Sequence, residues 1–171
     1  MTFLITNPPA LKKAQQEIRA HVGTKGFVDE DDVQELPYLK AIVKETFRLQ
    51  PAVPLLVPRE TVQDSQIGGY DIPAKTVVFV NAWAIGRFLG SEVDFKGVDF
   101  ELVPFGAGRR GCPGIHMGIA TVDLALANLL YRFDWELPPG TEREDVDFDV
   151  LPGITMHKKN HLWLVPKIPA A

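Results

Sequence analysis

The chain has 171 residues, of which 46% are hydrophobic and 23% charged, and its net charge is −4. These values are ordinary for one globular domain, and they argue against a nucleic-acid surface or a polyacidic tail. The lone cysteine excludes an internal disulfide, and no stretch approaches the roughly 18 apolar residues of a membrane span, so we expect no anchor in this chain.

A helix is predicted close to the N-terminus. Asn7 followed by Pro8-Pro9 is typical of a helix cap with proline in the first turn, and Gly23 supplies a stop. The apolar residues between them recur at helical spacing, namely Leu11, Ala14, Ile18 and Val22. The acidic stretch 27–35 then predicts a loop with a short helical turn.

A second helix is predicted from Pro37 to about Leu49, because Pro51 breaks the pattern that follows it. Its apolar stripe consists of Leu39, Ile42, Val43 and Phe47. Short runs punctuated by proline and glycine come next. Residues 55–61 are predicted to be extended, and residues 76–81 (TVVFVN) have the composition of a buried strand. Residues 88–101 look irregular.

The last predicted helix begins after Gly114. Its apolar residues fall on one face, namely Ile115, Ile119, Val122, Leu126, Leu129 and Phe133. A hairpin is predicted in the tail, with residues 154–157 paired to residues 161–165. Helices and small sheets therefore occupy separate blocks, and the predicted fold class is α+β, mainly helical.

The segment from Pro104 to Gly114 carries the strongest chemical signal, and it reads PFGAGRRGCPG. Its glycines let the backbone turn tightly and approach a large flat ligand. Cys112 stands just before a predicted helix, whose N-terminal dipole and free N–H groups favour a thiolate. Arg110 can reach a carboxylate on the ligand, and Phe105 can keep water from the sulfur.

A buried cysteine in a glycine-rich turn is the commoner alternative, but the spacing argues against it. The pattern Phe-x-x-Gly-x-Arg-x-Cys-x-Gly fixes five positions, namely Phe105, Gly108, Arg110, Cys112 and Gly114. In a chain of this length a chance match has odds on the order of 10⁻⁵ to 10⁻⁴ at average residue usage. We therefore predict that Cys112 is a ligand.

Other candidate residues are weaker. Cys112 and His116 have no second pair with which to complete a zinc site. His157 and His161 fall across the predicted turn and are expected at the surface. The tryptophans, which are Trp83, Trp135 and Trp163, are expected to pack.

The cysteine segment makes the chain resemble the cytochrome P-450 haem-thiolate monooxygenases. The subtype resembles the plant microsomal type, judging from the segment KAIVKETFRLQPAVPLLVPRE. The resemblance covers nearly the whole chain but only the C-terminal part of a family member. It implies the proximal part of the cytochrome P-450 fold with small β-sheets, so residues 1–171 would form a single partial domain. It also implies haem b bound through the Cys112 thiolate, which pushes electron density onto iron and favours O–O cleavage.

The resemblance assigns residues outside this segment as well. Glu45 and Arg48 resemble the family's Glu-x-x-Arg pair, which holds the haem-side core together; the alternative is an exposed pair on a helix. Arg59 resembles a second propionate-binding arginine alongside Arg110, and its alternative is a surface strand charge. Arg87 stands where the family has two arginines separated by further residues. It can represent either one structurally, and an internal deletion is predicted there.

The function implied is monooxygenation of a small lipophilic substrate, with electrons from NADPH through a reductase docking on the Cys112 side. Full-length members reside in the endoplasmic reticulum membrane; this chain, without an anchor, is expected to be cytoplasmic or of unknown location. The distal oxygen-activating helix should lie just before Met1, so no catalytic residue is assigned. The alternatives are a truncated, non-catalytic fragment that binds haem weakly or not at all, and a haem- or partner-binding module without turnover.

Overall fold

The computed structural model describes residues 1–85 and 103–169. The chain divides into two compact units. The helical unit comprises residues 1–46, 113–151 and 158–171, and the loop unit comprises residues 47–112 and 152–157. Arg87 and the predicted irregular segment 88–101 lie outside the described residues. No helix in the described ranges has the length and apolar character needed to cross a bilayer.

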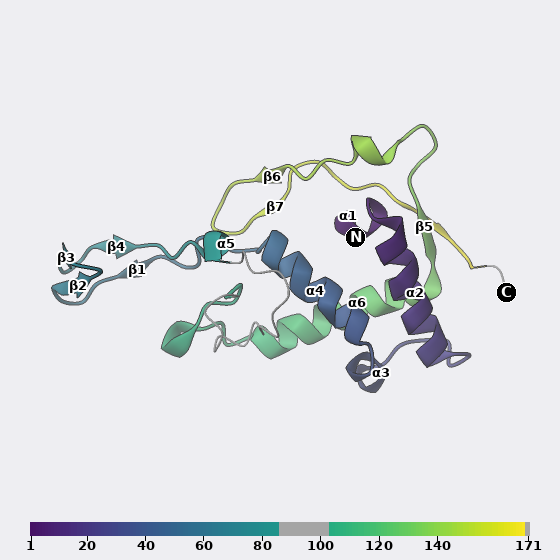
Figure 1. The fold of residues 1–171 in the computed structure, drawn as a ribbon, viewed down its shortest axis with the longest axis horizontal. Helices are drawn as coiled ribbons and strands as arrows, with labels where there is room; N and C mark the ends of the chain where they lie inside the picture. The colour runs from purple at the N-terminus through teal and green to yellow at the C-terminus, as the bar shows by residue number, and fades with distance from the viewer. Residues whose placement is uncertain (86–102, 170–171) are drawn as a thin grey trace. The chain divides into compact units, whose positions relative to one another are not determined.

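Helices dominate the helical unit, and the predicted α+β class is confirmed. Its helices are α1 (Thr2–Ile5), α2 (Pro8–Val22), α3 (Glu30–Gln34), the larger part of α4 (Pro37–Leu49) and α6 (Ile115–Arg132) (Figure 1). Its strand β5 (Asp134–Glu136) pairs antiparallel with β8 (Val165–Lys167), and η2 (Arg143–Asp145) lies between them in the sequence.

The predicted starts and stops of the first helices are confirmed. The Asn7 side chain accepts a hydrogen bond from the Ala10 N–H, and Gly23 caps the end of α2 with a φ of 56°. The α2 stripe that the sequence predicts is buried, and it packs with residues of α3, α4 and α6. The most deeply buried large side chains are Ile18, Leu36, Leu39 and Leu130. Burying an aliphatic side chain of this size stabilises the fold by about 1.5–3 kcal/mol.

Helix α6 buries the predicted face only in part: Leu126 packs against the core, but the fully buried residues belong to a neighbouring face. Val122 and Leu129 of the predicted stripe are 41% and 39% exposed, whereas Asp123, Ala127 and Leu130 are buried. Because α6 has apolar residues around most of its circumference, its apolar pattern does not select a face. Polar side chains of α6 help to decide which face is buried, because they bind the segment between α2 and α3.

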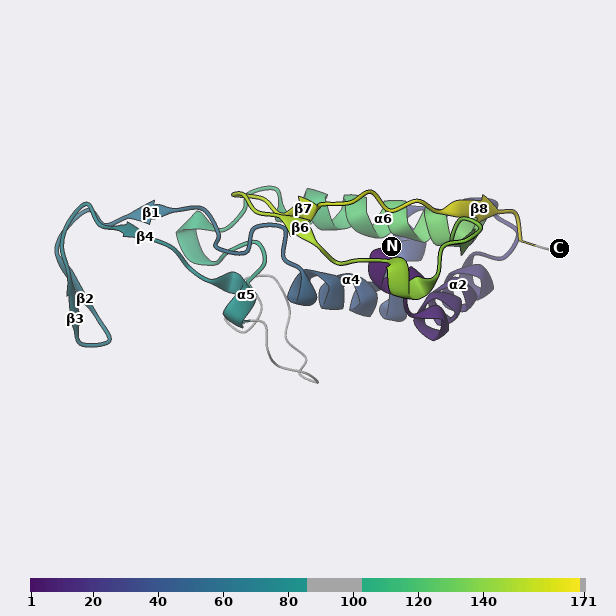
Figure 2. The same ribbon diagram turned by 90° about the horizontal axis from the view of Figure 1, so that it is seen from above.

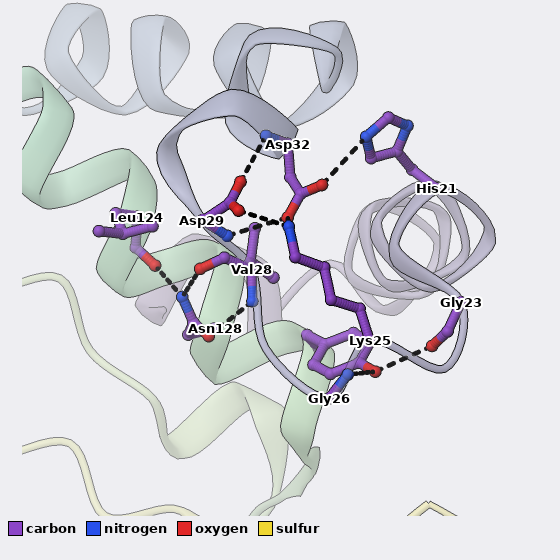
Figure 3. Close-up of polar contacts among 10 residues, drawn as sticks. His21, Gly23, Lys25, Gly26, Val28, Asp29, Asp32, Leu124 and Asn128 are labelled. Atoms are coloured by element: carbon purple, nitrogen blue, oxygen red, sulfur yellow. Dashed lines mark hydrogen bonds and ion pairs between the residues drawn. The ribbon is translucent and has the colours of Figure 1, made fainter.

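Asn128 of α6 binds the backbone of the segment between α2 and α3 (Figure 3), and so does Tyr131 of the same helix. The Asn128 amide accepts from the Val28 N–H at 3.0 Å and donates to the Val28 carbonyl at 2.9 Å. The Tyr131 hydroxyl donates to the Gly23 carbonyl at 2.9 Å and accepts from the Gly26 N–H. These bonds satisfy backbone groups of an irregular segment and fix the rotation of α6 against it.

A charge cluster lies in the same segment (Figure 3). Lys25 Nζ donates to carboxylate oxygens of Asp29 and Asp32, and His21 Nε2 lies 3.5 Å from Asp32 Oδ1. The hydrogen bond from Lys25, followed by one from the backbone N–H of Asp32, lowers the pKa of Asp29 to about 2. Asp29 and Asp32 also form a reciprocal capping box at the start of α3.

The loop unit contains a two-stranded arm. β1 (Arg59–Glu60) pairs antiparallel with β4 (Val77–Val78), and β2 (Ser65–Ile67) continues the arm with β3 (Tyr70–Ile72) (Figures 1 and 2). The short helix α5 (Ala82–Ile85) follows in the sequence.

Two strand predictions in the loop unit are wrong. Residues 76–81 do not form a buried strand: only Val77–Val78 is paired, and Val77 and Phe79 are 56% and 54% exposed. Within the described residues, the two-stranded arm gives these β-forming residues a pairing partner but no second layer to pack against. The predicted extended run 55–61 is interrupted at Leu56, whose φ is 51°.

The tail also pairs differently from the predicted hairpin. β7 (His157–Lys158) pairs with β6 (Val150–Leu151), and β8 pairs with β5. Lys158, predicted in the turn, instead donates from Nζ to Asp147 Oδ1 at 2.9 Å and lowers the pKa of that carboxyl. This attraction to an acidic stretch upstream competes with a local turn. His157 and His161 are exposed, as predicted.

The tryptophans do not share one environment. Trp135 is half-buried against the helical core, and its indole N–H donates to the Leu129 carbonyl at 3.0 Å. Trp83 and Trp163 are 58% and 72% exposed. The packing predicted for all three is therefore confirmed only for Trp135.

Candidate functional site

The cysteine loop, residues 104–114, is shaped by backbone hydrogen bonds. The Gly106 N–H donates to the Val103 carbonyl at 2.9 Å, and the Gly111 N–H donates to the Gly108 carbonyl across η1 (Gly108–Arg110). The Cys112 N–H then donates to the Phe105 carbonyl at 2.9 Å. This last bond brings the two ends of the motif together, so that Cys112 and Phe105 are neighbours in space.

Two glycines of the loop adopt conformations that favour glycine. Gly106 and Gly108 have φ values of 72° and 67°, where an L side chain costs about 1–2 kcal/mol. A β-carbon at Gly106 would meet Leu56 Cδ1 at 3.7 Å, an ordinary contact, so the backbone angle and not the space requires glycine. Gly114 differs, because its φ is −93° and it serves as the N-cap of α6.

Cys112 is a free, exposed cysteine. A buried structural cysteine, the alternative left open by the sequence, therefore does not describe this chain. A thiolate is a metal ligand only where an incoming metal can reach it, and an exposed sulfur meets that condition.

Phe105 connects the loop to the neighbouring structure. Its half-buried ring meets the ring of Phe47 edge-on, with centroids 5.2 Å apart and an interplanar angle of 73°. A small apolar cluster of Leu56, Ala82 and Val103 is buried in the same unit, with Val80 and Ala107 packed against it.

The predicted arginines of the site are both exposed. Arg59 lies on β1 opposite Val78, and Arg110 is the last residue of η1. An exposed guanidinium can offer a fork of N–H donors to a carboxylate from solvent.

Glu45 and Arg48 lie three residues apart on α4, and both are half-buried. Their half-burial differs from the fully exposed pair that is the alternative interpretation. Phe47 lies between them in the sequence and reaches the cysteine loop, a role that the sequence did not assign to it. The only signal for Phe47 was its place in the predicted apolar stripe.

Asp123 of α6 is the notable buried polar residue of the helical unit. Only 5% of it is exposed, and within the described residues its Oδ1 has no hydrogen-bond partner. Burial raises the pKa of this carboxyl, and the charge of Lys40 partly opposes the rise. Asp123 did not belong to the predicted apolar stripe, so nothing in the pattern indicated a buried acid.

The model of the family described as Cytochrome P450 matches residues 1–165. The chain belongs to the cytochrome P450 family. It is 54% identical to Cytochrome P450 71A1 of Persea americana, 52% identical to 5-OH-xanthotoxin synthase of Pastinaca sativa and 50% identical to Cytochrome P450 83A1 of Arabidopsis thaliana. Each alignment covers 98% of this P450 chain but only 36–37% of the relative.

The predicted family is therefore confirmed. The chain spans little more than a third of the length of these P450 relatives. The three alignments run over 182, 185 and 188 positions although the chain has 171 residues, which agrees with the predicted internal deletion. Haem is the cofactor of the cytochrome P450 family.

Proposed function

We propose that this chain forms the haem-thiolate part of a cytochrome P450 monooxygenase, with Cys112 as the axial ligand of haem b. The observation that carries the proposal is the exposed Cys112, at the end of a loop fixed by left-handed glycines and by its own hydrogen bond to Phe105. Haem bound through a thiolate supplies oxygen activation, because the thiolate pushes electron density onto the iron.

The other motif residues, together with Arg59, hold the cofactor and shield the sulfur. Arg110 and Arg59 bind the haem propionates through charge-assisted hydrogen bonds, for which their exposed positions leave room. Phe105 lies next to Cys112 through the backbone bond and limits the access of water to the sulfur. Gly108 and Gly114 belong to the same binding loop.

Glu45 and Arg48 brace the end of α4, which carries the aromatic contact to the loop. Their half-buried positions support this structural role, because a half-buried charge pair is less screened by solvent than an exposed one. Arg87 completes the proposed set as a structural residue.

For the full-length protein we propose insertion of one oxygen atom from O₂ into a small lipophilic substrate, with electrons from NADPH through a reductase. The endoplasmic reticulum membrane is its proposed location. For residues 1–171 we propose haem binding; the alternative is a non-catalytic fragment that binds haem weakly or not at all.

The test is the absorption spectrum of the purified chain with added haem, reduced and exposed to carbon monoxide. We expect a strongly red-shifted Soret band, and we expect Cys112→Ala to lose it. His116→Ala is the matched control, because His116 is an exposed potential ligand four residues further on, and its spectrum should match the parent's. A band typical of neutral-ligand haem in the parent, unchanged in Cys112→Ala, would contradict the proposal.

A further inference from the structure

The contact between Phe47 and Phe105 joins the last turn of α4 to the cysteine loop. The rings lie 5.2 Å apart between centroids at 73°, within the same compact unit. Edge-to-face pairs of this kind contribute stability beyond the area that they bury. Within the described residues of the loop unit, the buried apolar cluster consists of Leu56, Ala82 and Val103, and this ring contact is a further apolar contact made by the loop.

Phe105 is held at both its side chain and its backbone. Phe47 contacts its ring, and its carbonyl accepts the Cys112 N–H at 2.9 Å. The next residue, Gly106, has a φ of 72° and resists backbone rotation weakly because it has no side chain. Together with the Gly106 bond to the Val103 carbonyl, the ring contact is therefore one restraint that keeps the Phe105 carbonyl aimed at Cys112.

We propose that Phe47 is a positioning residue for Cys112. By holding the Phe105 ring, it keeps the loop in the conformation in which the Cys112 amide is bonded and the sulfur is presented. The inference rests on the proposed function only for the role of Cys112 as a ligand. The chain of contacts from Phe47 to Cys112 is independent of haem.

The experiment compares Phe47→Leu, which keeps apolar bulk and removes the ring, with the matched control Phe133→Leu. Phe133 makes an edge-to-face contact with Trp135 in the helical unit, with centroids 5.6 Å apart at 67°. Amide hydrogen exchange is measured at Cys112 and at Leu130 in the haem-free chain. We expect Phe47→Leu to accelerate exchange at Cys112 about tenfold relative to Leu130, and Phe133→Leu to leave Cys112 unchanged.

Alkylation of Cys112 by iodoacetamide gives a second readout, because it is the lone cysteine in the sequence. Its rate should change in Phe47→Leu and return to the parent rate in Phe47→Tyr, which restores the ring. Equal acceleration at Cys112 and Leu130 would overturn the proposal, since it would mean general loss of structure. Unchanged exchange at Cys112 would overturn it too. Neither outcome depends on the carbon monoxide spectrum, which tests the proposed function separately.

Discussion

Each of the two units of the molecule is stabilised internally by a different kind of interaction. In the helical unit, buried apolar residues of α2, α3, α4 and α6 form one core, in which Ile18 and Leu130 have no exposed surface. Among the described residues of the loop unit, the buried cluster consists of Leu56, Ala82 and Val103, and the strands form an arm with exposed side chains. Burial stabilises the first unit, whereas backbone bonds and glycine conformations shape the second.

The difference explains why the proposed ligand site lies where it does. Backbone hydrogen bonds specify a shape but contribute little net stability each, about 0.5–1.5 kcal/mol. A cofactor that binds only the folded loop stabilises it by mass action. The cysteine loop can therefore depend on haem for part of its stability, while the helical core does not.

The largest effect is expected in the helical core. Ile18 is completely buried, so Ile18→Ala should lower the free energy of unfolding by about 2–5 kcal/mol through lost burial and a cavity. Denaturant titration measures the loss. Val62→Ala, at a residue 94% exposed in the arm, is the control and should stay within about 0.5 kcal/mol of the parent. Equal losses of unfolding free energy in the two variants would contradict the claim that burial in the core stabilises the helical unit.

The next effect concerns the backbone of the cysteine loop. Gly108 has a φ of 67°, and a β-carbon added there would meet nothing within 4 Å, so Gly108→Ala introduces strain and no clash. We expect haem binding to weaken about tenfold, corresponding to a cost of about 1–2 kcal/mol. Gly108→Asn should lose less, because asparagine tolerates left-handed backbone. Haem titration followed by absorbance measures both, and an unaffected Gly108→Ala variant would refute the argument.

These tests bear on what the sequence could predict. The ends of α2 were predictable because Asn7 and Gly23 act on the backbone beside them. The buried face of α6 was not, because an apolar pattern around the helix leaves the choice to partners such as Val28. The length and burial of the strand at residues 76–81 were overestimated, because β-propensity does not say whether a second layer exists.

Within the site, too, local features were predictable from the sequence and contacts between distant residues were not. The spacing of the motif around Cys112 gave the family directly, because five fixed residue types rarely coincide. The Phe47–Phe105 contact was not predictable, because it joins residues far apart in the sequence whose apolar character is shared by many others. The left-handed backbone of Leu56 gave no signal either, because leucine rarely adopts it.

A smaller effect is expected at Asp123. Burial raises its pKa in the folded state, so its contribution to stability is largest below the unfolded value of about 3.9 and falls as pH rises through the folded value. Asp123→Asn should therefore raise the free energy of unfolding at pH 7 by about 1 kcal/mol. Unfolding curves at pH 7 and pH 3 measure this. A gain that persists undiminished at pH 3 would argue against the charge as its cause.

The smallest effect is expected at Lys25. Its hydrogen bond lowers the pKa of Asp29 to about 2, so the stability it contributes is present above about 3.9 and lost as pH falls toward the folded value. In Lys25→Gln, the Asp29 pKa should rise toward its ordinary value. Carboxyl NMR titration measures this pKa. Because the group is exposed, little change in stability at neutral pH should accompany it. An unmoved Asp29 midpoint would contradict the assignment.

The most direct test of the account is amide hydrogen exchange of the chain with and without haem. We expect haem to slow exchange in the cysteine loop, at Gly106, Gly111 and Cys112, and to leave the amides of α2 and α6 unchanged. The Cys112→Ala variant should lose this protection. Equal slowing in both units, or the same slowing in Cys112→Ala, would contradict the claim that the cysteine loop is the haem-dependent part of the molecule.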